Sequence, residues 1–306
     1  MNQHKNARFI FLLTGLLLML TACQPARTSN KDEVLQVTVS ILPQAYFVER
    51  IGGEIFAVNV MVGPGEEAHT YEPRPEQMKA LTDSQVFFTI GVEYEENWIP
   101  RFQEINPSMH VVDSAEGITR IQGSDDHSFE ADNEGSHQDE GQYAGFDPHV
   151  WLAPENGKTI AGNILNALIE LVPDRAKTFQ ANFTNLIVDI DTLNARLEST
   201  LANLENQRFM VFHPAWAYFA NQYNLEQIAF QIGGQDPSAR EMAELVKIAQ
   251  DSNIRVIFIQ PTFSTSDAQA IAAEINAEIA LADPLARNWL ENLESVAEAF
   301  ASAMRQ

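Results

Sequence analysis

The stretch that decides the fold is residues 174–206, which read DRAKTFQANFTNLIVDIDTLNARLESTLANLEN. Large apolar residues recur in it three and four positions apart, a spacing that places them on one face of a helix: Phe179, Phe183, Leu186, Ile190, Leu193, Leu197, Leu201 and Leu204. Such a helix is about 50 Å long at ~1.5 Å per residue, and the average helix has only ~11–12 residues. A coiled coil is one interpretation. A rigid rod that joins two lobes fits better, because strands and helices alternate on both sides of it.

Short apolar strands and helical patterns alternate on each side of this stretch. We expect strands at 34–41, 56–62, 86–90 and 110–113 before it, and at 209–212, 228–230, 256–259 and 279–281 after it. We expect helices at 43–51, 75–82, 242–249 and 268–275, the third after a Ser238-x-x-Glu241 capping box. This rhythm predicts an α/β fold of two lobes with parallel sheets flanked by helices. The N-terminal lobe covers 34–173, the joining helix 174–206 and the C-terminal lobe 207–306.

Composition narrows the function classes. The chain has 306 residues, 45% of them hydrophobic, which is enough for a real core and excludes global disorder. Its formal charge is −23, from 19 Lys+Arg against 42 Asp+Glu, and this excludes a general nucleic-acid binder, which needs a basic face. The single Cys cannot form an intramolecular disulfide, a Cys-rich zinc site or an iron–sulfur cluster.

The start of the chain has the features of an export signal. Lys5 and Arg8 precede an apolar run over 9–20, which is shorter than the ~20 residues that span a bilayer. The run ends in Leu20-Thr21-Ala22-Cys23, which resembles the bacterial lipobox and implies cleavage before Cys23 and lipidation of its thiol. An uncleaved signal anchor is the alternative. We therefore expect a signal peptide at 1–22, a tether at 23–33, and an extracytoplasmic body anchored by lipid to a bacterial membrane, in the periplasm or on the outer face of the cell membrane.

Residues 121–142 interrupt the alternation of strands and helices. They contain seven acids and no Lys or Arg, together with His127 and His137. Nothing apolar repeats there, so we expect a disordered loop within the N-terminal lobe. The loop is either simply solvated or a weak collector of cations, in which case His127 and His137 are auxiliary metal ligands.

Four potential metal ligands lie in loops, and all but His149 follow a predicted strand: His69, His149, His213 and Asp283. In open α/β sheets, ligands bind beyond the carboxyl ends of the strands, so these side chains could converge in one cleft, two from each half. The spacing alone is only moderately specific. It matches no local metal motif such as His-Glu-x-x-His, and an isolated loop histidine is more often structural.

Five segments, in order, closely resemble the metal-binding lipoproteins of bacterial ABC importers for zinc and manganese. They read PGEEAHTYEP at 64–73, DPHVW at 147–151, VFHPAWAYF at 211–219, FIQPTFS at 258–264 and DPL at 283–285. The resemblance covers nearly the whole chain after the signal peptide. It implies two α/β lobes joined by one long helix, as the apolar stripe at 174–206 independently suggests.

The resemblance also implies the ligand set, residue by residue. By position the metal ligands are His69, His149, His213 and Asp283, with Glu66 or Glu67 as substitutes for Asp283. The third ligand is His213, as in zinc-type members, where manganese-type members have Glu. Imidazole suits zinc, added carboxylate favours manganese, and three His with one carboxylate can fill a tetrahedral zinc shell. Glu72 and Asp147 are candidates for fixing the histidine tautomers from outside.

The implied function is the capture of Zn²⁺ outside the cytoplasm and its delivery to an ABC permease, by a monomer that is not an enzyme. Mn²⁺ or Fe²⁺ as cargo is the main alternative. A zinc hydrolase, with three His and a catalytic water, is a weaker one, and so is a surface adhesin. A long helix between the lobes resists wide hinge closure, so we expect only loop motion or a modest tilt of the lobes on release.

Overall fold

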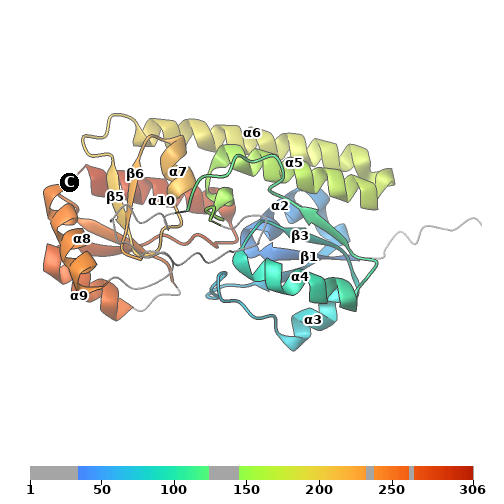
Figure 1. Ribbon diagram of the computed structural model, residues 1–306. Coiled ribbons are helices and arrows are strands. Elements are labelled where there is room, and N and C mark those ends of the chain that lie inside the picture. Colours follow the sequence, from blue (N-terminus) through green and yellow to red (C-terminus); the bar gives the residue numbers. More distant parts are fainter. Residues whose placement is uncertain (1–33, 124–144, 232–237, 262–264, 306) are drawn as a thin grey trace, which may run out of the picture. The chain divides into compact units, whose positions relative to one another are not determined.

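The computed structural model describes residues 34–123, 145–231, 238–261 and 265–305 (Figure 1). The predicted signal peptide, Cys23 and the tether lie outside these residues, as do His127, His137 and nearly all of the acidic loop. Within the described part, no helix is both long enough and apolar enough to cross a membrane.

The N-terminal lobe is a four-stranded parallel sheet with helices. Its elements are β1 (Leu35–Ile41), α2 (Leu42–Gly52), a 3₁₀ turn (Gly53–Ile55), β2 (Phe56–Val62), α3 (Pro75–Leu81), β3 (Ser84–Thr89), α4 (Glu93–Ile105) and β4 (His110–Asp113). The strand order is β2-β1-β3-β4. In this register Val39 of β1 lies between Val60 and Phe88, so the centre of the sheet is apolar on neighbouring strands.

The C-terminal lobe repeats this plan. Its elements are β5 (Arg208–Val211), α7 (Ala217–Gln222), β6 (Glu226–Ala229), α8 (Ala239–Asp251), β7 (Val256–Ile259), α9 (Thr265–Ile275), β8 (Glu278–Leu281) and α10 (Trp289–Met304). The sheet is parallel, with order β6-β5-β7-β8. The predicted fold class is thereby confirmed, and the expected capping box is present, with Ser238 accepting from Glu241 N.

A long helix lies between the two sheets in the chain. A 3₁₀ turn (Val150–Leu152), α5 (Pro154–Leu171) and a second 3₁₀ turn (Pro173–Arg175) lead into α6 (Ala176–Leu201). Figure 1 shows α5 and α6 side by side, and α6 packs on α2, α5 and α10. The buried face of α6 carries most of the predicted stripe: Phe179, Leu186, Ile190, Leu193, Leu197 and Leu201.

The helix ends earlier than the spacing predicts. After Leu201, Ala202 is extended (ψ 145°) and Asn203 is left-handed (φ 57°), a conformation that Asn tolerates at the end of a helix. Leu204 is nevertheless buried, so it extends the apolar stripe without being helical. Helix α10, which was not expected, has the same kind of stripe, with Trp289, Leu293, Val296 and Phe300 buried.

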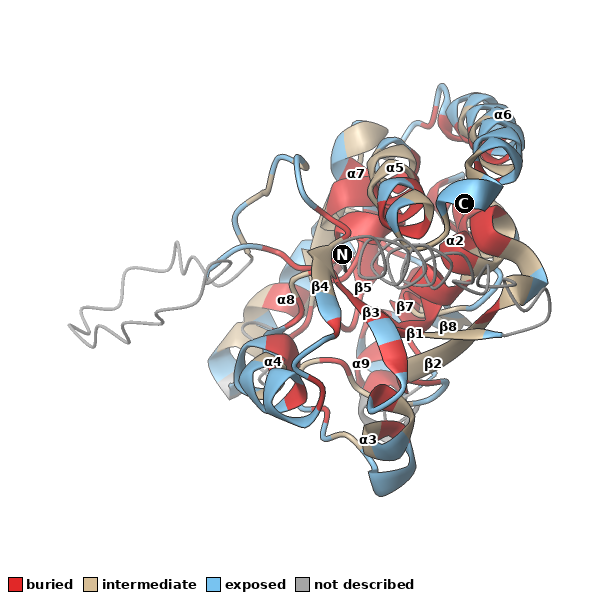
Figure 2. Cartoon of the chain, turned by 90° about the vertical axis from the view of Figure 1, so that its right-hand side faces the viewer, coloured by how far each residue is buried: buried red, intermediate tan, exposed pale blue. Residues whose placement is uncertain are grey.

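One apolar cluster runs through both lobes and joins them. Trp289 at the start of α10 packs on Phe47 of α2, with ring centroids 4.9 Å apart, and donates its indole N–H to the Trp151 carbonyl at 2.7 Å. Trp151 in turn donates to the Pro284 carbonyl at 2.7 Å. These contacts tie the two lobes together. Figure 2 shows buried residues concentrated on the strands and on the helix faces that cover them.

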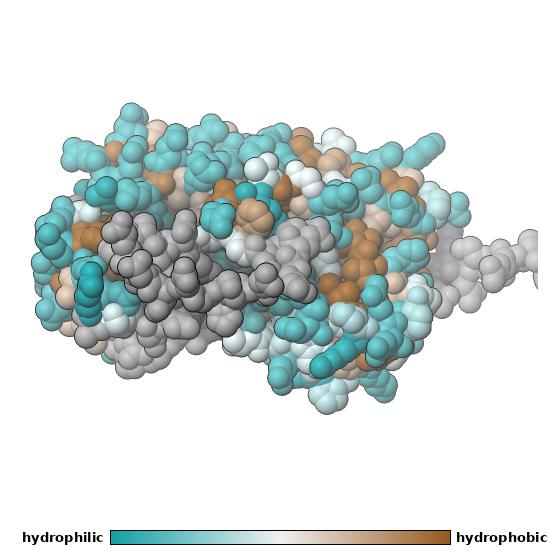
Figure 3. Space-filling view, viewed as in Figure 1, coloured by the Kyte–Doolittle hydropathy of each residue, from teal (hydrophilic) through white to brown (hydrophobic). Residues whose placement is uncertain are grey.

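The C-terminal sheet has a second, smaller cluster on its other face, built around Met210, Phe212 and Ile257 and covered by residues of α8 and α9. Outside these cores, the face seen in Figure 3 is mostly hydrophilic with scattered apolar patches. The large exposed apolar residues are spread over distant elements: Val34, Ile105, Phe146, Val188, Ile248 and Leu281.

Candidate metal centre

His69 is presented by the loop between β2 and α3. Glu66 stabilises the start of this loop, because its carboxylate accepts from Gly63 N at 2.7 Å and pairs with Arg74 at 2.7 Å. Gly65 takes a left-handed conformation (φ 75°) that Gly adopts at no steric cost. The imidazole of His69 is partly buried, with 26% of the side chain exposed.

The other two histidines are buried and lie beside structured segments. His149 directly precedes the 3₁₀ turn that begins at Val150, and His213 is the second residue after the end of β5; their exposed fractions are 6% and 8%. Phe212 N donates to the Phe258 carbonyl at 2.8 Å, which extends the β5–β7 pairing up to His213. The position of His213 is therefore set by the sheet.

The three imidazoles meet through their Nε2 atoms. The distance from Nε2 of His213 to Nε2 of His69 is 3.2 Å, and to Nε2 of His149 it is 3.3 Å. In the described part of the chain, these are the three residues whose ligand atoms gather closely enough to hold a metal ion. Tetrahedral zinc with Zn–N bonds of ~2.0–2.1 Å needs nitrogens about 3.3–3.4 Å apart, so the observed spacing fits.

Each histidine has an acceptor on its outer nitrogen. Nδ1 of His69 faces a Glu93 oxygen at 2.8 Å, Nδ1 of His149 faces Asp147 Oδ1 at 2.9 Å, and Nδ1 of His213 faces Gln231 Oε1 at 3.3 Å. Because these oxygens accept, each Nδ1 carries the proton and each Nε2 presents a lone pair inward. Three lone pairs at this spacing repel one another, and a cation between them removes the repulsion.

The surroundings shift the ionisation of these groups. Burial, together with the neighbouring charges of His149 and His69, holds the pKa of His213 well below its usual value. Burial also lowers the pKa of His69, but the hydrogen bond and charge of Glu93, with the charges of Glu67 and Asp147, outweigh it and raise the pKa overall. The same contact lowers the pKa of Glu93, although burial opposes this. His213 is therefore ready to bind a metal at neutral pH.

Asp283 is not brought into the group of three. It follows β8, is half-buried, and accepts from Leu285 N at 2.9 Å; burial raises its pKa. It lines a pocket of about 260 Å³ with Glu66 and Gln260. The carboxylate beside the inward nitrogens is that of Glu67, whose Oε1 lies 3.7 Å from His69 Nε2 while Oε2 accepts from Gln260 at 3.2 Å.

Among the acids proposed as outer partners, Asp147 and Glu72 differ in position. Asp147 accepts from both N and Nδ1 of His149. Glu72 is exposed, and the acid that faces His69 is Glu93. The sequence did not single out Glu93 or Gln231. Both come soon after a strand, Glu93 after β3 and Gln231 after β6, so the rule that ligands gather at carboxyl strand ends could have found them.

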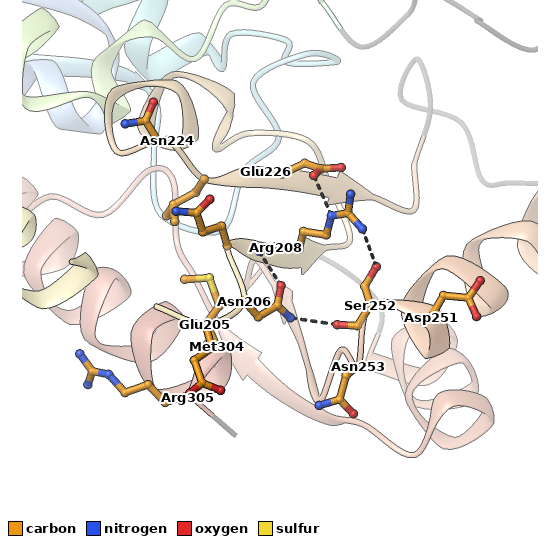
Figure 4. A pocket seen from close by; sticks show the side chains of 12 residues that line it. Glu205, Asn206, Arg208, Asn224, Glu226, Asp251, Ser252, Asn253, Met304 and Arg305 are labelled. Atoms are coloured by element: carbon orange, nitrogen blue, oxygen red, sulfur yellow. Dashed lines mark hydrogen bonds and ion pairs between the residues drawn. The ribbon is translucent and has the colours of Figure 1, made fainter. Parts of the chain in front are cut away.

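A pocket of about 700 Å³ lies elsewhere, at the amino ends of β5 and β6. Its polar groups bind one another (Figure 4): Arg208 pairs with Glu226 at 2.7 Å and donates to Ser252 Oγ at 3.2 Å. Asn206 donates to the Ser252 carbonyl at 2.9 Å. No cluster of metal-ligand type occurs there among the described residues, so the histidine group is the candidate site.

The fold and the site together define a solute-binding protein of two α/β lobes. A family model described as the periplasmic component A of the zinc-uptake complex matches residues 37–303. The chain belongs to this family, as the sequence motifs predicted. Because the family consists of solute-binding proteins, the chain is not an enzyme, and placement outside the cytoplasm is supported.

Individual relatives agree with this placement. The chain is 27% identical to the high-affinity zinc uptake system protein ZnuA of Bacillus subtilis over 277 residues, 88% of this chain and 85% of that protein. It is 25% identical to the zinc-binding lipoprotein AdcA of Streptococcus pneumoniae, over 90% of this chain and 54% of that one. A crystal structure of ZnuA is 38% identical with a TM-score of 0.80, over 89% of this chain and 99% of that one, and a zinc-bound deletion mutant gives the same values.

Proposed function

We propose that this chain captures Zn²⁺ outside the cytoplasm and delivers it to the permease of an ABC importer. The observation that carries the proposal is the convergence of three Nε2 atoms at 3.2 and 3.3 Å, each backed by an acceptor on Nδ1. Membership of the zinc-uptake family and the zinc-bound ZnuA structure support the same cargo.

The ligand chemistry favours zinc over manganese or iron. All three converging atoms are imidazole nitrogens, which suit zinc, whereas manganese favours a site richer in carboxylate. Mn²⁺ or Fe²⁺ in the same role remains the alternative cargo. A fourth, oxygen ligand would complete the tetrahedron: Glu67, whose carboxylate lies 3.7 Å from His69 Nε2, is one candidate, and Asp283 is the other.

The remaining parts of the proposal concern the chain outside the described fold. We propose that lipid on Cys23 anchors the protein to the membrane, that it acts as a monomer, and that His127 and His137 serve only as auxiliary ligands. A variant lacking residues 124–142 should then keep one tight zinc site. Loss of tight, stoichiometric binding in this variant would contradict the separation between the loop and the three-histidine site.

Metal competition tests the cargo directly. The full chain, purified from membranes in mild detergent, is titrated with Zn²⁺ and Mn²⁺ against a chelator of known affinity. We expect one tight Zn²⁺ per chain, weaker Mn²⁺, and loss of the tight site in a triple variant, His69→Ala with His149→Ala and His213→Ala. Preference for Mn²⁺ would overturn the zinc assignment.

Growth in zinc-depleted medium tests delivery. Cells of the source bacterium that lack the chain should grow poorly there and recover with zinc, with the wild-type gene, but not with the triple variant. Equal growth of cells with and without the gene would contradict a role in zinc uptake.

A further inference from the structure

Tyr218 of α7 lies between two segments of the N-terminal lobe. These segments, 121–123 and 145–147, flank the acidic loop and pair in antiparallel fashion: Gln122 bridges Phe146, and Gly123 N donates to the Gly145 carbonyl at 2.9 Å. Tyr218 is 4% exposed, and its hydroxyl reaches both segments. It accepts from Ile121 N at 3.1 Å and donates to the Asp147 carbonyl at 3.0 Å.

The hydroxyl takes the place of a backbone hydrogen bond. Ile121 and Asp147 lie opposite each other, and residues so placed in an antiparallel pair exchange two N–H···O bonds. One of these is present, from Asp147 N to the Ile121 carbonyl at 3.0 Å. The phenol oxygen bridges the two groups of the second. Burial raises the pKa of Tyr218, so the hydroxyl keeps the proton that it donates.

This contact joins the C-terminal lobe to the parts that orient two metal ligands. Tyr218 is five residues after His213, which follows β5. Asp147, whose carbonyl accepts the phenol proton, uses its carboxylate to hold both N and Nδ1 of His149. The hydroxyl therefore sets the distance between the segment that carries His149 and the segment that carries His213.

The third histidine, His69, is connected to the same segment, 121–123. Arg120, next to Ile121, donates to the Ile90 carbonyl at 3.0 Å. Ile90 begins the turn that leads from β3 to Glu93, and Glu93 faces Nδ1 of His69. Movement of Ile121 away from the C-terminal lobe would thus displace the outer hydrogen-bond partners of both His149 and His69.

We propose that the hydroxyl of Tyr218 is a positioning group for the metal site, which holds the two lobes at the spacing that three nitrogens on one ion require. The inference rests on the proposed function, because it presumes that the three histidines bind a metal ion. Tyr218 touches no metal ion in this role. It acts through Ile121 and Asp147, and its loss should mainly speed metal release.

Tyr218→Phe tests the proposal with the loss of a single oxygen. Tyr223→Phe is the matched control, because Tyr223 follows the same helix and its hydroxyl donates to Asn194 Oδ1 at 2.7 Å, away from the histidines. In the full chain loaded with Zn²⁺, the release rate is followed with excess chelator. The visible spectrum of the Co²⁺ form reports ligand geometry, and thermal unfolding of the metal-free chains reports stability.

We expect Tyr218→Phe to release zinc about fivefold to tenfold faster and to alter the Co²⁺ spectrum, as loss of one or two hydrogen bonds implies. Tyr223→Phe should change neither. Two results would overturn the inference: a release rate within twofold of wild type, or equal acceleration by both variants in step with lost stability. Either would leave the proposed function intact, whereas failure of the wild type to bind zinc would contradict the proposed function itself.

Discussion

The two lobes share a strand order but differ in what they place at the strand ends. In β2-β1-β3-β4 and β6-β5-β7-β8, β5 takes the place of β1 and β6 that of β2. The histidine of the C-terminal lobe follows β5, whereas at the end of β1 the chain enters α2 and Gln44 accepts from Ile41 N. His69 instead follows β2, whose counterpart β6 is followed by Gln231, the partner of His213.

This difference teaches that topology decides where side chains meet, and residue type decides what they do there. The N-terminal lobe supplies two imidazoles with carboxylate partners, and the C-terminal lobe supplies one imidazole with an amide partner. The consequence is visible in the ionisation: His69 has a raised pKa and His213 a lowered one. A metal ion bound to all three joins an anionic half-site to a neutral one.

Removal of a metal ligand from either lobe should have the largest effect on zinc affinity. His213→Ala removes the C-terminal nitrogen of the group, and His149→Ala one of the two N-terminal nitrogens. We expect each to weaken zinc binding by more than about 100-fold, since even an outer partner is worth ~10–100-fold. Chelator competition measures this, with the exposed His110 as control through His110→Ala. Retention of affinity within tenfold in His213→Ala would show that the C-terminal lobe is not part of the site.

Replacement of the outer hydrogen-bond partners of the histidines should show which lobe's partner contributes more to zinc affinity. Asp147→Asn removes a charged acceptor and should cost ~10–100-fold in zinc affinity. Gln231→Leu removes a neutral acceptor at 3.3 Å, and neutral hydrogen bonds are weaker, so the cost should be under about tenfold. The same competition assay measures both. A larger loss in Gln231→Leu would reverse our ranking of the two half-sites.

The shared core that joins the lobes can be tested with two glycines of α5. A Cβ on Gly157 would lie 2.4 Å from the Trp289 ring, whereas one on Gly162 meets nothing within 4 Å. Gly157→Ala should therefore destabilise the protein by ~1–3 kcal/mol through overpacking. Gly162→Ala should stabilise it by up to ~1 kcal/mol, because Ala is the better helix former. Thermal unfolding measures both, and equal midpoints would show that Trp289 does not pack tightly on α5.

The smallest expected effect is a shift in the pH dependence of zinc binding. A protonated imidazole cannot bind metal, so affinity is full above the pKa of His69 and falls as pH drops below it. Glu93 helps to raise that pKa; Glu93→Gln should therefore move the fall in affinity to lower pH. Glu104→Gln, an exposed change of the same charge on α4, is the control. Zinc titrations across pH 5 to 8 measure the shift, and a move to higher pH would contradict the role of Glu93.

Much of the fold was readable from local pattern. All eight strands were expected near their observed bounds, because short apolar runs between turn residues report burial directly. The predicted end of the joining helix was wrong, because Leu204 keeps the apolar spacing although the backbone has already left the helix at Ala202. Helix α4 was not expected; it contains Pro100, and its apolar residues are few.

The sequence by itself determined the order of strands and helices along the chain and the residue types available to the site. It placed His69, His149, His213 and Asp283 in loops, all but His149 after predicted strands, and the motifs around them indicated the family. Only the tertiary structure decided which of these atoms meet. Three Nε2 atoms converge, the Glu67 carboxylate lies beside them, and Asp283 is not part of the group. Glu93 and Gln231 face the outer nitrogens of two histidines, and Tyr218 bonds the backbone next to the third. The physical reason is that spacing along a chain reports local periodicity. A contact between residues far apart in sequence depends on how two sheets and a shared core are packed against each other.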